Sequence, residues 1–146
     1  KVFAPDLAAH PFLSNNSKWI NFLLVKNKNW FFENVVLIGD ALHTAHFSIG
    51  SGTKLAMEDA IALAESFQQT SDALSHFTAK RRPVIQDYQA AAFESMRWFE
   101  NASKYMHLSP MELAYSLMTR SGRVSYEDLN RRDPDFIKRY ATDHTD

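Results

Sequence analysis

The stretch that decides the fold runs from Val35 to Ala64 and reads VVLIGDALHTAHFSIGSGTKLAMEDAIALA. Its first four residues, Val35 to Ile38, form a continuous apolar run rich in β-branched side chains, which is typical of a strand buried on both faces. Gly39-Asp40 ends that run. From Leu55 onward apolar residues recur at helical spacing, which predicts a helix that begins near Gly52. The stretch therefore predicts a strand, a loop and a helix in succession.

The predicted helix has an apolar face, and its acidic residues lie off that face. The apolar positions are Ala56, Ala60, Leu63, Ala64 and Phe67, and the acidic positions are Glu58, Asp59 and Glu65. The chain has four glycines, and three of them, Gly39, Gly50 and Gly52, lie in this stretch. Because glycine permits unusual backbone conformations and close ligand approach, the loop is where the sequence predicts a functional site.

Length and composition bound the class of protein. The chain has 146 residues, of which 45% are hydrophobic, and this suffices for the core of one domain. A formal net charge of -1 argues against a nucleic-acid or anionic-membrane partner. The absence of cysteine excludes disulfides and thiolate metal sites, and no apolar run approaches the roughly 20 residues that span a bilayer. We therefore expect a cytoplasmic globular protein without a membrane or nucleic-acid partner.

The other elements follow from hydrophobic periodicity and from capping signals. The expected elements are a helix end at residues 1–7, a strand at 19–25, a turn at 30–34, and helices at 52–68, from 73 onward, 84–106, 111–118, 125–129 and 133–140. Pro83 is expected to kink or restart the helix that begins at Ala73. Two strands are too few for a free-standing sheet, so we expect their partners to lie outside this chain.

Three kinds of site fit the loop poorly. The sequence GSGTK resembles a phosphate-binding loop, but a threonine separates the glycine and lysine that must be adjacent. His43 and His46 are three residues apart, yet no cysteine or further histidine is near, so we expect no metal. A triad of Ser48, His43 and Asp40 lacks the glycine pattern of a nucleophile elbow.

A helix N-terminus facing a ligand fits the loop better. Gly50 and Gly52 leave its peptide N–H groups accessible, and a helix N-terminus favours anions. Lys54 in the first turn opposes the helix dipole by roughly 0.3 to 1 kcal/mol, which an anionic partner would relieve; alternatively, Lys54 extends into solvent. Asp40 either caps local amides or accepts a hydrogen bond from a sugar or polyol hydroxyl.

Together, Gly39-Asp40, His43, the Gly50-x-Gly52 pair and Asp59 resemble the second flavin-binding motif of FAD-dependent aromatic hydroxylases of the para-hydroxybenzoate hydroxylase type. The resemblance implies that Asp40 binds the ribityl chain of FAD. It also implies that helix amides face the N1 and O2 edge of the isoalloxazine, where reduced flavin carries negative charge. The cofactor-binding residues it implies are Gly39, Asp40, Gly50, Ser51, Gly52, Thr53 and Lys54.

The chain departs from the usual motif at two places, where His46-Phe47 replaces Pro-Pro and Lys54 replaces Asn. The variant HFSIGSGTKLAMEDA, with AKRRPVIQDYQ, RWFENASKYM and LMTRSGRVSYEDLNRRDP, is similar to a narrower branch of the salicylyl-CoA 5-hydroxylase and 2-aminobenzoyl-CoA monooxygenase type. A violacein-pathway hydroxylase is a more distant relative. His46 and Phe47 are predicted to line the reaction chamber as catalytic residues. Alternatively, His46 packs in the loop and satisfies a backbone carbonyl.

The resemblance implies a fragment of an α/β, Rossmann-like FAD-binding monooxygenase fold, mainly α-helical here with about two short β-strands. Residues 1–69 would hold the end of the substrate domain and the second flavin motif, and residues 70–146 a C-terminal helical region. No GxGxxG pattern occurs, so the N-terminal FAD-binding half is expected upstream. In this branch an old-yellow-enzyme-like barrel can follow downstream.

The implied reaction is hydroxylation of an aromatic ring, as an aromatic acyl-CoA thioester, with FAD, NAD(P)H and O2. The chain alone is expected to be inactive, and a homo-oligomer is one expected state. One alternative is a flavin hydroxylase of a non-CoA aromatic such as an indole derivative. Another is a helical interaction module in which the glycine loop merely turns the chain.

Overall fold

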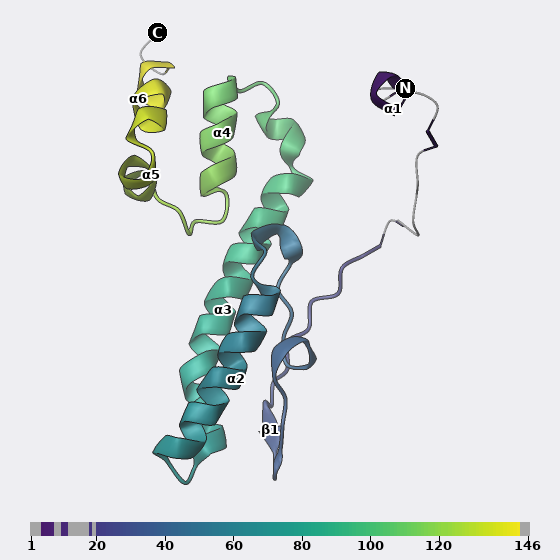
Figure 1. Cartoon of the computed structure of the whole chain (residues 1–146), viewed down its shortest axis with the longest axis vertical. Helices are drawn as coiled ribbons and strands as arrows, with labels where there is room; N and C mark the ends of the chain where they lie inside the picture. Colours follow the sequence, from purple (N-terminus) through teal and green to yellow (C-terminus); the bar gives the residue numbers. More distant parts are fainter. Residues whose placement is uncertain (1–3, 8–9, 12–17, 19, 144–146) are drawn as a thin grey trace.

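The computed structural model describes residues 4–7, 10–11, 18 and 20–143, and these are mainly helical (Figure 1). The helices are α1 (Ala4–Leu7), α2 (Gly52–Gln69), α3 (Ala73–Glu100), α4 (Pro110–Thr119), α5 (Tyr126–Arg132) and α6 (Pro134–Asp143). Three 3-10 turns are η1 (Gly39–Ala41), η2 (Phe47–Ile49) and η3 (Ala102–Tyr105), and the two strands are β1 (Phe31–Phe32) and β2 (Val35–Val36). The expectation of a helical segment with about two short strands is confirmed.

Helices α2 and α3 form an antiparallel pair that carries the fold (Figure 1). The loop from η1 to η2 and the hairpin lie along one side of this pair. The core between them consists of Trp30, Leu42, Leu55, Ala62, Phe77 and Ile85. Since Trp30 and Leu42 come from the loop side and the other four from the two helices, the same core fixes the loop on α2.

The predicted apolar face of α2 is wrong. The buried positions are Leu55, Asp59, Ala62 and Ser66, whereas Phe67 is 64% exposed. Alanines occur all around this helix, so they do not distinguish one face from another. The true inner face holds two polar residues, and each has a partner on α3: Asp59 meets Arg81, and Ser66 meets His76.

The strand predictions are only partly confirmed. β1 and β2 form an antiparallel hairpin in which Phe31 pairs with Val36 and Phe32 with Val35. Val35 is 62% exposed, so the expectation of a strand buried on both faces is wrong, because no further strand among the described residues covers the hairpin. Residues 20–25 are not a strand, and a single bridge joins Lys26 to His43. Residue 19 lies outside the described residues.

Helix α3 passes through Pro83 as one continuous element, so the expected restart is wrong. Proline removes one helical hydrogen bond, but Phe77 and Ile85 on either side of it are both buried against α2. Farther along α3, Ala91, Ala92 and Ser95 are buried as well. The helix ends at Glu100 rather than near residue 106.

The C-terminal helices begin where the capping signals predict. Ser109 and Glu112 form a reciprocal capping box at the start of α4, with Pro110 as its first residue. The indole of Trp98 donates to Ser116 Oγ at 2.8 Å, which ties α4 to α3. Tyr115 stacks on Tyr140 of α6 with ring centroids 4.2 Å apart. In the described part of the chain, no helix combines the length and apolarity needed to cross a membrane.

Candidate functional site

A groove of about 590 Å³ lies where η1, η2 and the start of α2 meet. It gathers most of the residues that the sequence analysis assigned to the cofactor. Its lining residues are Phe22, Asp40, Thr44, Ala45, Phe47, Gly50, Ser51, Gly52, Thr53 and Ala56. Residues from three consecutive elements therefore face one space.

The N-terminus of α2 opens into this groove without a side-chain cap. Ser51 is the N-cap residue, but its hydroxyl donates to the Ile49 carbonyl at 3.2 Å. The first helical bond is from Leu55 N–H to Ser51 O, 3.0 Å. The N–H groups of the three preceding residues thus lack an intrahelical acceptor. A Cβ built at Gly50 or Gly52 meets nothing within 4 Å, so the peptide edge is accessible and carries the partial positive charge of the helix end.

Asp40 lies on the rim of the groove, on the turn η1. The preceding Gly39 has a φ of +58°, and its carbonyl accepts from both Leu42 and His43 N–H at 2.9 Å. A Cβ at Gly39 would lie 3.2 Å from Ala56 Cβ, which explains the glycine where the turn touches α2. Within the described residues, the exposed Asp40 carboxylate has no hydrogen bond or ion pair, so it caps no described amide.

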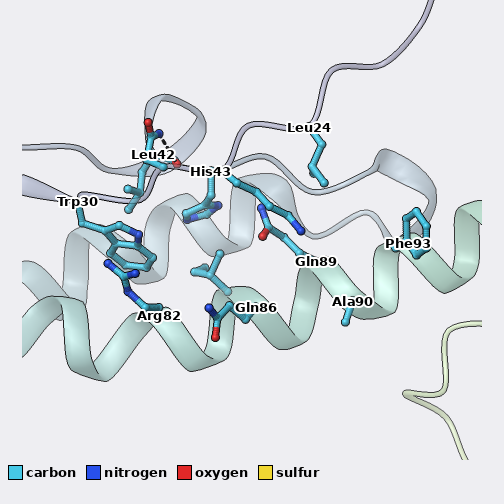
Figure 2. A pocket seen from close by; sticks show the side chains of 12 residues that line it. Leu24, Trp30, Leu42, His43, Arg82, Gln86, Gln89, Ala90 and Phe93 are labelled. Atoms are coloured by element: carbon cyan, nitrogen blue, oxygen red, sulfur yellow. Dashed lines mark hydrogen bonds between the residues drawn. The ribbon is translucent and has the colours of Figure 1, made fainter.

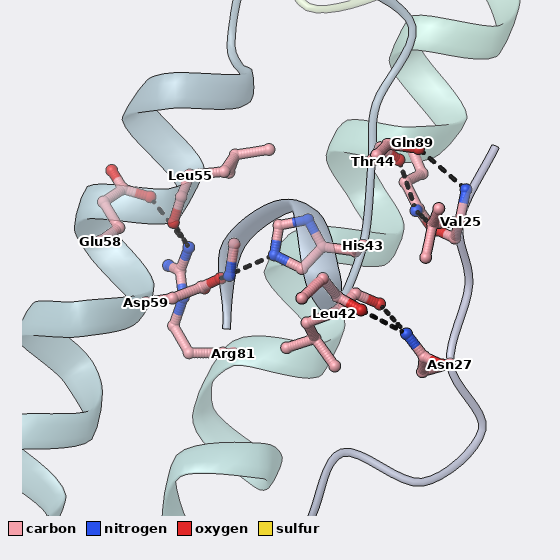
Figure 3. A network of polar contacts seen from close by, with 12 residues as sticks. Val25, Asn27, Leu42, His43, Thr44, Leu55, Glu58, Asp59, Arg81 and Gln89 are labelled. Carbon is pink, nitrogen blue, oxygen red and sulfur yellow. Dashed lines mark hydrogen bonds and ion pairs between the residues drawn. The ribbon is translucent and has the colours of Figure 1, made fainter. Parts of the chain in front are cut away.

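A buried network holds this turn against both helices (Figure 3). Asp59, with 0% exposure, accepts from His43 Nε2 at 2.7 Å and from Gly39 N–H at 3.2 Å on one oxygen. Its other oxygen accepts from Arg81 Nε at 2.9 Å. Arg81 also pairs with Glu58 at 3.2 Å. Burial pushes the pKa of Asp59 upward, but the bonds from His43, Arg81 and Gly39 outweigh it and hold the pKa below its usual value.

His43 and Asp59 belong to the predicted motif, but no contact was predicted for either, and Arg81 was not predicted as a site residue. A usable signal exists: Phe77, Arg81 and Ile85 are four residues apart on one helical face, so the charged member needs a buried partner. The partner lies on another helix, which periodicity alone does not reveal.

Gly39 and Lys54 are predicted cofactor residues that do not line the groove. Gly39 is buried beneath it. Lys54 forms an ion pair with Glu58 and also contacts the Tyr88 hydroxyl at 3.2 Å. The bond to Glu58, and then that to Tyr88, raises the pKa of Lys54. Its ammonium is therefore engaged along the α2–α3 surface.

His46 and Phe47 stack on each other with ring centroids 4.3 Å apart, and Phe22 meets both edge-on. Phe47 lines the groove, whereas His46 lines an adjoining pocket of about 190 Å³ with Phe22, Leu24, Gln89, Phe93 and Met96. His46 Nδ1 accepts from Ser48 N–H at 3.3 Å. In the neutral imidazole the proton therefore sits on Nε2.

On the other side of the loop lies a pocket of about 390 Å³ between residues 24–30 and α3 (Figure 2). Gln89 Nε2 donates there to the carbonyls of Val25 and Thr44. Asn27 Nδ2 donates to Ala41 and Leu42. These bonds hold residues 24–30 against the loop. They therefore stabilise the loop on the side away from the groove.

Neither the metal site at His43 and His46 nor the triad of Ser48, His43 and Asp40 has the geometry that its chemistry needs. His43 pairs with Asp59, while His46 faces Phe22, so the two histidines do not converge. The described residues contain no group of three or more potential metal ligands. Ser48 Oγ donates to the Ala92 carbonyl at 3.3 Å, and His43 bonds to Asp59 rather than Asp40, so no triad forms.

No family model matches the chain. Three similar proteins are nevertheless all named as hydroxylases or monooxygenases. Salicyloyl-CoA 5-hydroxylase from a Streptomyces species is 40% identical over 87% of this chain and 26% of its own length. The 3-hydroxy-4-methyl-anthranilyl-[aryl-carrier protein] 5-monooxygenase of Streptosporangium sibiricum is 43% identical over 87% of this chain and 36% of its own. Protodeoxyviolaceinate monooxygenase of Chromobacterium violaceum is 35% identical over 82% and 33%, respectively.

Shorter matches include proteins named FAD-dependent monooxygenases. The chain spans about a quarter to a third of the length of the first three relatives. Over most of its own length, the chain is therefore similar to one part of each of these hydroxylases and monooxygenases.

Proposed function

We propose that this chain is the flavin-facing segment of a monooxygenase that hydroxylates an aromatic ring with FAD as cofactor. The observation that carries the proposal is the groove that is lined both by Asp40 and by the N-terminus of α2, which has no side-chain cap. The names of the relatives support the same reaction class.

The donor set of the groove fits FAD. Free amides at a helix N-terminus suit an edge that carries negative charge, and an unpaired carboxylate suits the hydroxyls of a polyol chain. The open space at Gly50 and Gly52 allows a flat ring to approach the backbone. When bound, FAD supplies the redox chemistry of oxygen insertion. The chain would hold it through Asp40 and through the amides of Gly52 and Thr53.

The chain's second role in the proposed reaction is to shape the space next to the cofactor and to exclude water from it. Phe47 and Phe22 form an apolar wall between the groove and the pocket of His46, and exclusion of water suppresses unproductive decay of reactive states. The His46 Nε2–H, at the pocket of Phe93 and Met96, would hydrogen-bond a polar substituent of the substrate.

The proposed substrate is an aromatic acid carried as a thioester, because the names of the first two relatives include CoA and an aryl-carrier protein. A free aromatic is the second candidate, favoured by the violaceinate-type name of the third relative. NAD(P)H and O2 are the proposed co-substrates. The rest of the FAD site would come from the part of the complete protein that corresponds to the remaining residues of the relatives.

The test is the change Asp40→Asn in the complete polypeptide. Losing a charged hydrogen bond should weaken FAD binding by about 1 to 3 kcal/mol. FAD affinity is measured by flavin absorbance and fluorescence titration. Asp135→Asn is the matched control, because Asp135 is also exposed and lies on α6, where it pairs with Lys138.

Equal affinity in both variants would remove Asp40 from the site. A complete polypeptide that purifies without flavin bands and does not bind added FAD would contradict the proposed function. It would instead support the interaction-module alternative.

A further inference from the structure

We propose that Asp59 is a positioning residue for the cofactor groove: this one buried carboxylate fixes the Asp40 turn and the N-terminus of α2 relative to each other. The inference rests on the proposed function, since the groove is taken as the FAD site. Asp59 does not line the groove, so it would act through the backbone that does.

The geometry joins three segments at one carboxyl group. Asp59 lies about two turns along α2 from Gly52. Its Oδ2 accepts from the N–H of Gly39, the residue directly before Asp40, and from His43 at the other end of the same turn. Its Oδ1 accepts from Arg81 on α3. The turn that carries Asp40 is thus held at both ends to the helix that carries the amides, and Figure 3 shows His43 beside Asp59.

Both side-chain oxygens at position 59 must accept hydrogen bonds. All three neighbours are donors: a peptide N–H, an imidazole N–H and a guanidinium. An asparagine would place its own NH2 against the turn or against Arg81, and a donor facing a donor leaves buried groups unpaired. Because Asp59 and Arg81 are almost fully buried, water does not replace the lost bond.

A second buried residue on α2, Ser66, provides a control that distinguishes a positioning role from a general contribution to stability. Ser66 has 0% exposure and also joins α2 to α3, through His76 Nδ1 at 3.0 Å. It lies almost two turns beyond Asp59, and its hydroxyl bonds to the Ala62 carbonyl and to His76 rather than to the Asp40 turn. Loss of the Ser66 hydroxyl therefore weakens helix packing while leaving the Asp40 turn in place.

The experiment compares four variants of the complete polypeptide: Asp59→Asn, His43→Leu, His43→Gln and Ser66→Ala. Glutamine at residue 43 keeps an N–H donor for Asp59, and leucine removes it. Three quantities are measured for each: the FAD dissociation constant, amide hydrogen exchange of residues 37–45 in the apoprotein, and the unfolding temperature.

Asp59→Asn and His43→Leu should raise the FAD dissociation constant by about tenfold or more, and should speed exchange in residues 37–45. His43→Gln should restore both quantities to within about twofold of the unmodified protein. Ser66→Ala should lower the unfolding temperature and leave both quantities within the same margin. If Asp59→Asn does not fold, the two His43 variants decide.

Unchanged exchange and unchanged FAD affinity in Asp59→Asn or His43→Leu would overturn the inference. So would a loss of affinity in all four variants that follows unfolding temperature alone. Failure of the proposed function looks different: the unmodified polypeptide would bind no FAD, while the exchange measurement would still report on the turn. Asp40→Asn that weakens FAD, together with a silent Asp59→Asn, would leave the function standing and remove only the positioning role.

Discussion

His46 is one of the residues at which this chain differs from the flavin-binding motif that it resembles. Its Nδ1 is occupied by Ser48 N–H, so its Nε2–H is the group available at the pocket of Phe93 and Met96. We predict that His46→Ala in the complete enzyme lowers coupling, the fraction of NAD(P)H oxidation that yields hydroxylated product, by several-fold.

FAD affinity should change little in His46→Ala, because His46 does not line the FAD groove. Coupling is measured as product formed per NAD(P)H consumed, with His107→Ala as control, since His107 is an exposed histidine in the loop before α4. Coupling, turnover and substrate affinity that all remain at the unmodified level would make His46 a packing residue of the loop.

The sequence predicted the residues that line the groove better than it predicted the buried network of Asp59 and Arg81 that holds the groove in place. Asp40, Gly50 and Gly52 are close in sequence, so a local pattern suffices to bring them together. Asp59 and Arg81 lie 22 residues apart on different helices. Spacing alone did not place their contact, although a charge on an apolar helical stripe signals that one must exist.

Gly52 of α2 and Gly39 of η1 offer two contrasting substitutions. Gly52 is the first residue of the helix and has open space around a built Cβ. We predict that Gly52→Ala keeps or slightly raises the unfolding temperature, because alanine orders a helix better by roughly 0.5 to 1 kcal/mol. It should still weaken FAD binding, because the added methyl enters the groove. Both quantities are read from one preparation by thermal unfolding and FAD titration.

Gly39→Ala is the contrasting change. Gly39 has a φ of +58°, and its Cβ would lie 3.2 Å from Ala56 Cβ, so both unfolding temperature and FAD affinity should fall. If Gly52→Ala binds FAD as tightly as the unmodified protein, the α2 amides do not face the cofactor.

Helices were predictable because their signals are local, and strands were not. The box formed by Ser109 and Glu112 marks the start of α4 within four residues of sequence. Val35 to Ile38 reads as a buried strand, yet burial depends on neighbouring strands that the described residues do not supply. The division between residues 1–69 and 70–146 remains a prediction.

Several large apolar side chains are exposed on α2 and on the hairpin. Met57, Ile61 and Phe67 on α2, with Phe32 and Val35, are each more than half exposed. Exposed apolar patches often mark an interface, and this chain spans only about a quarter to a third of the length of those relatives. We therefore propose that the rest of the monooxygenase covers these side chains.

The last prediction concerns this 146-residue chain expressed alone. It should bind FAD only weakly, because one carboxylate and a few amides must offset several kcal/mol of lost translational and rotational freedom. It should also self-associate through the open apolar side chains, and Ile61→Lys should reduce that association without unfolding the chain, since Ile61 is 59% exposed. FAD titration and light scattering of the purified chain test both expectations. Submicromolar FAD binding by a monomer would contradict them, since it would mean that the groove holds the cofactor without the rest of the protein.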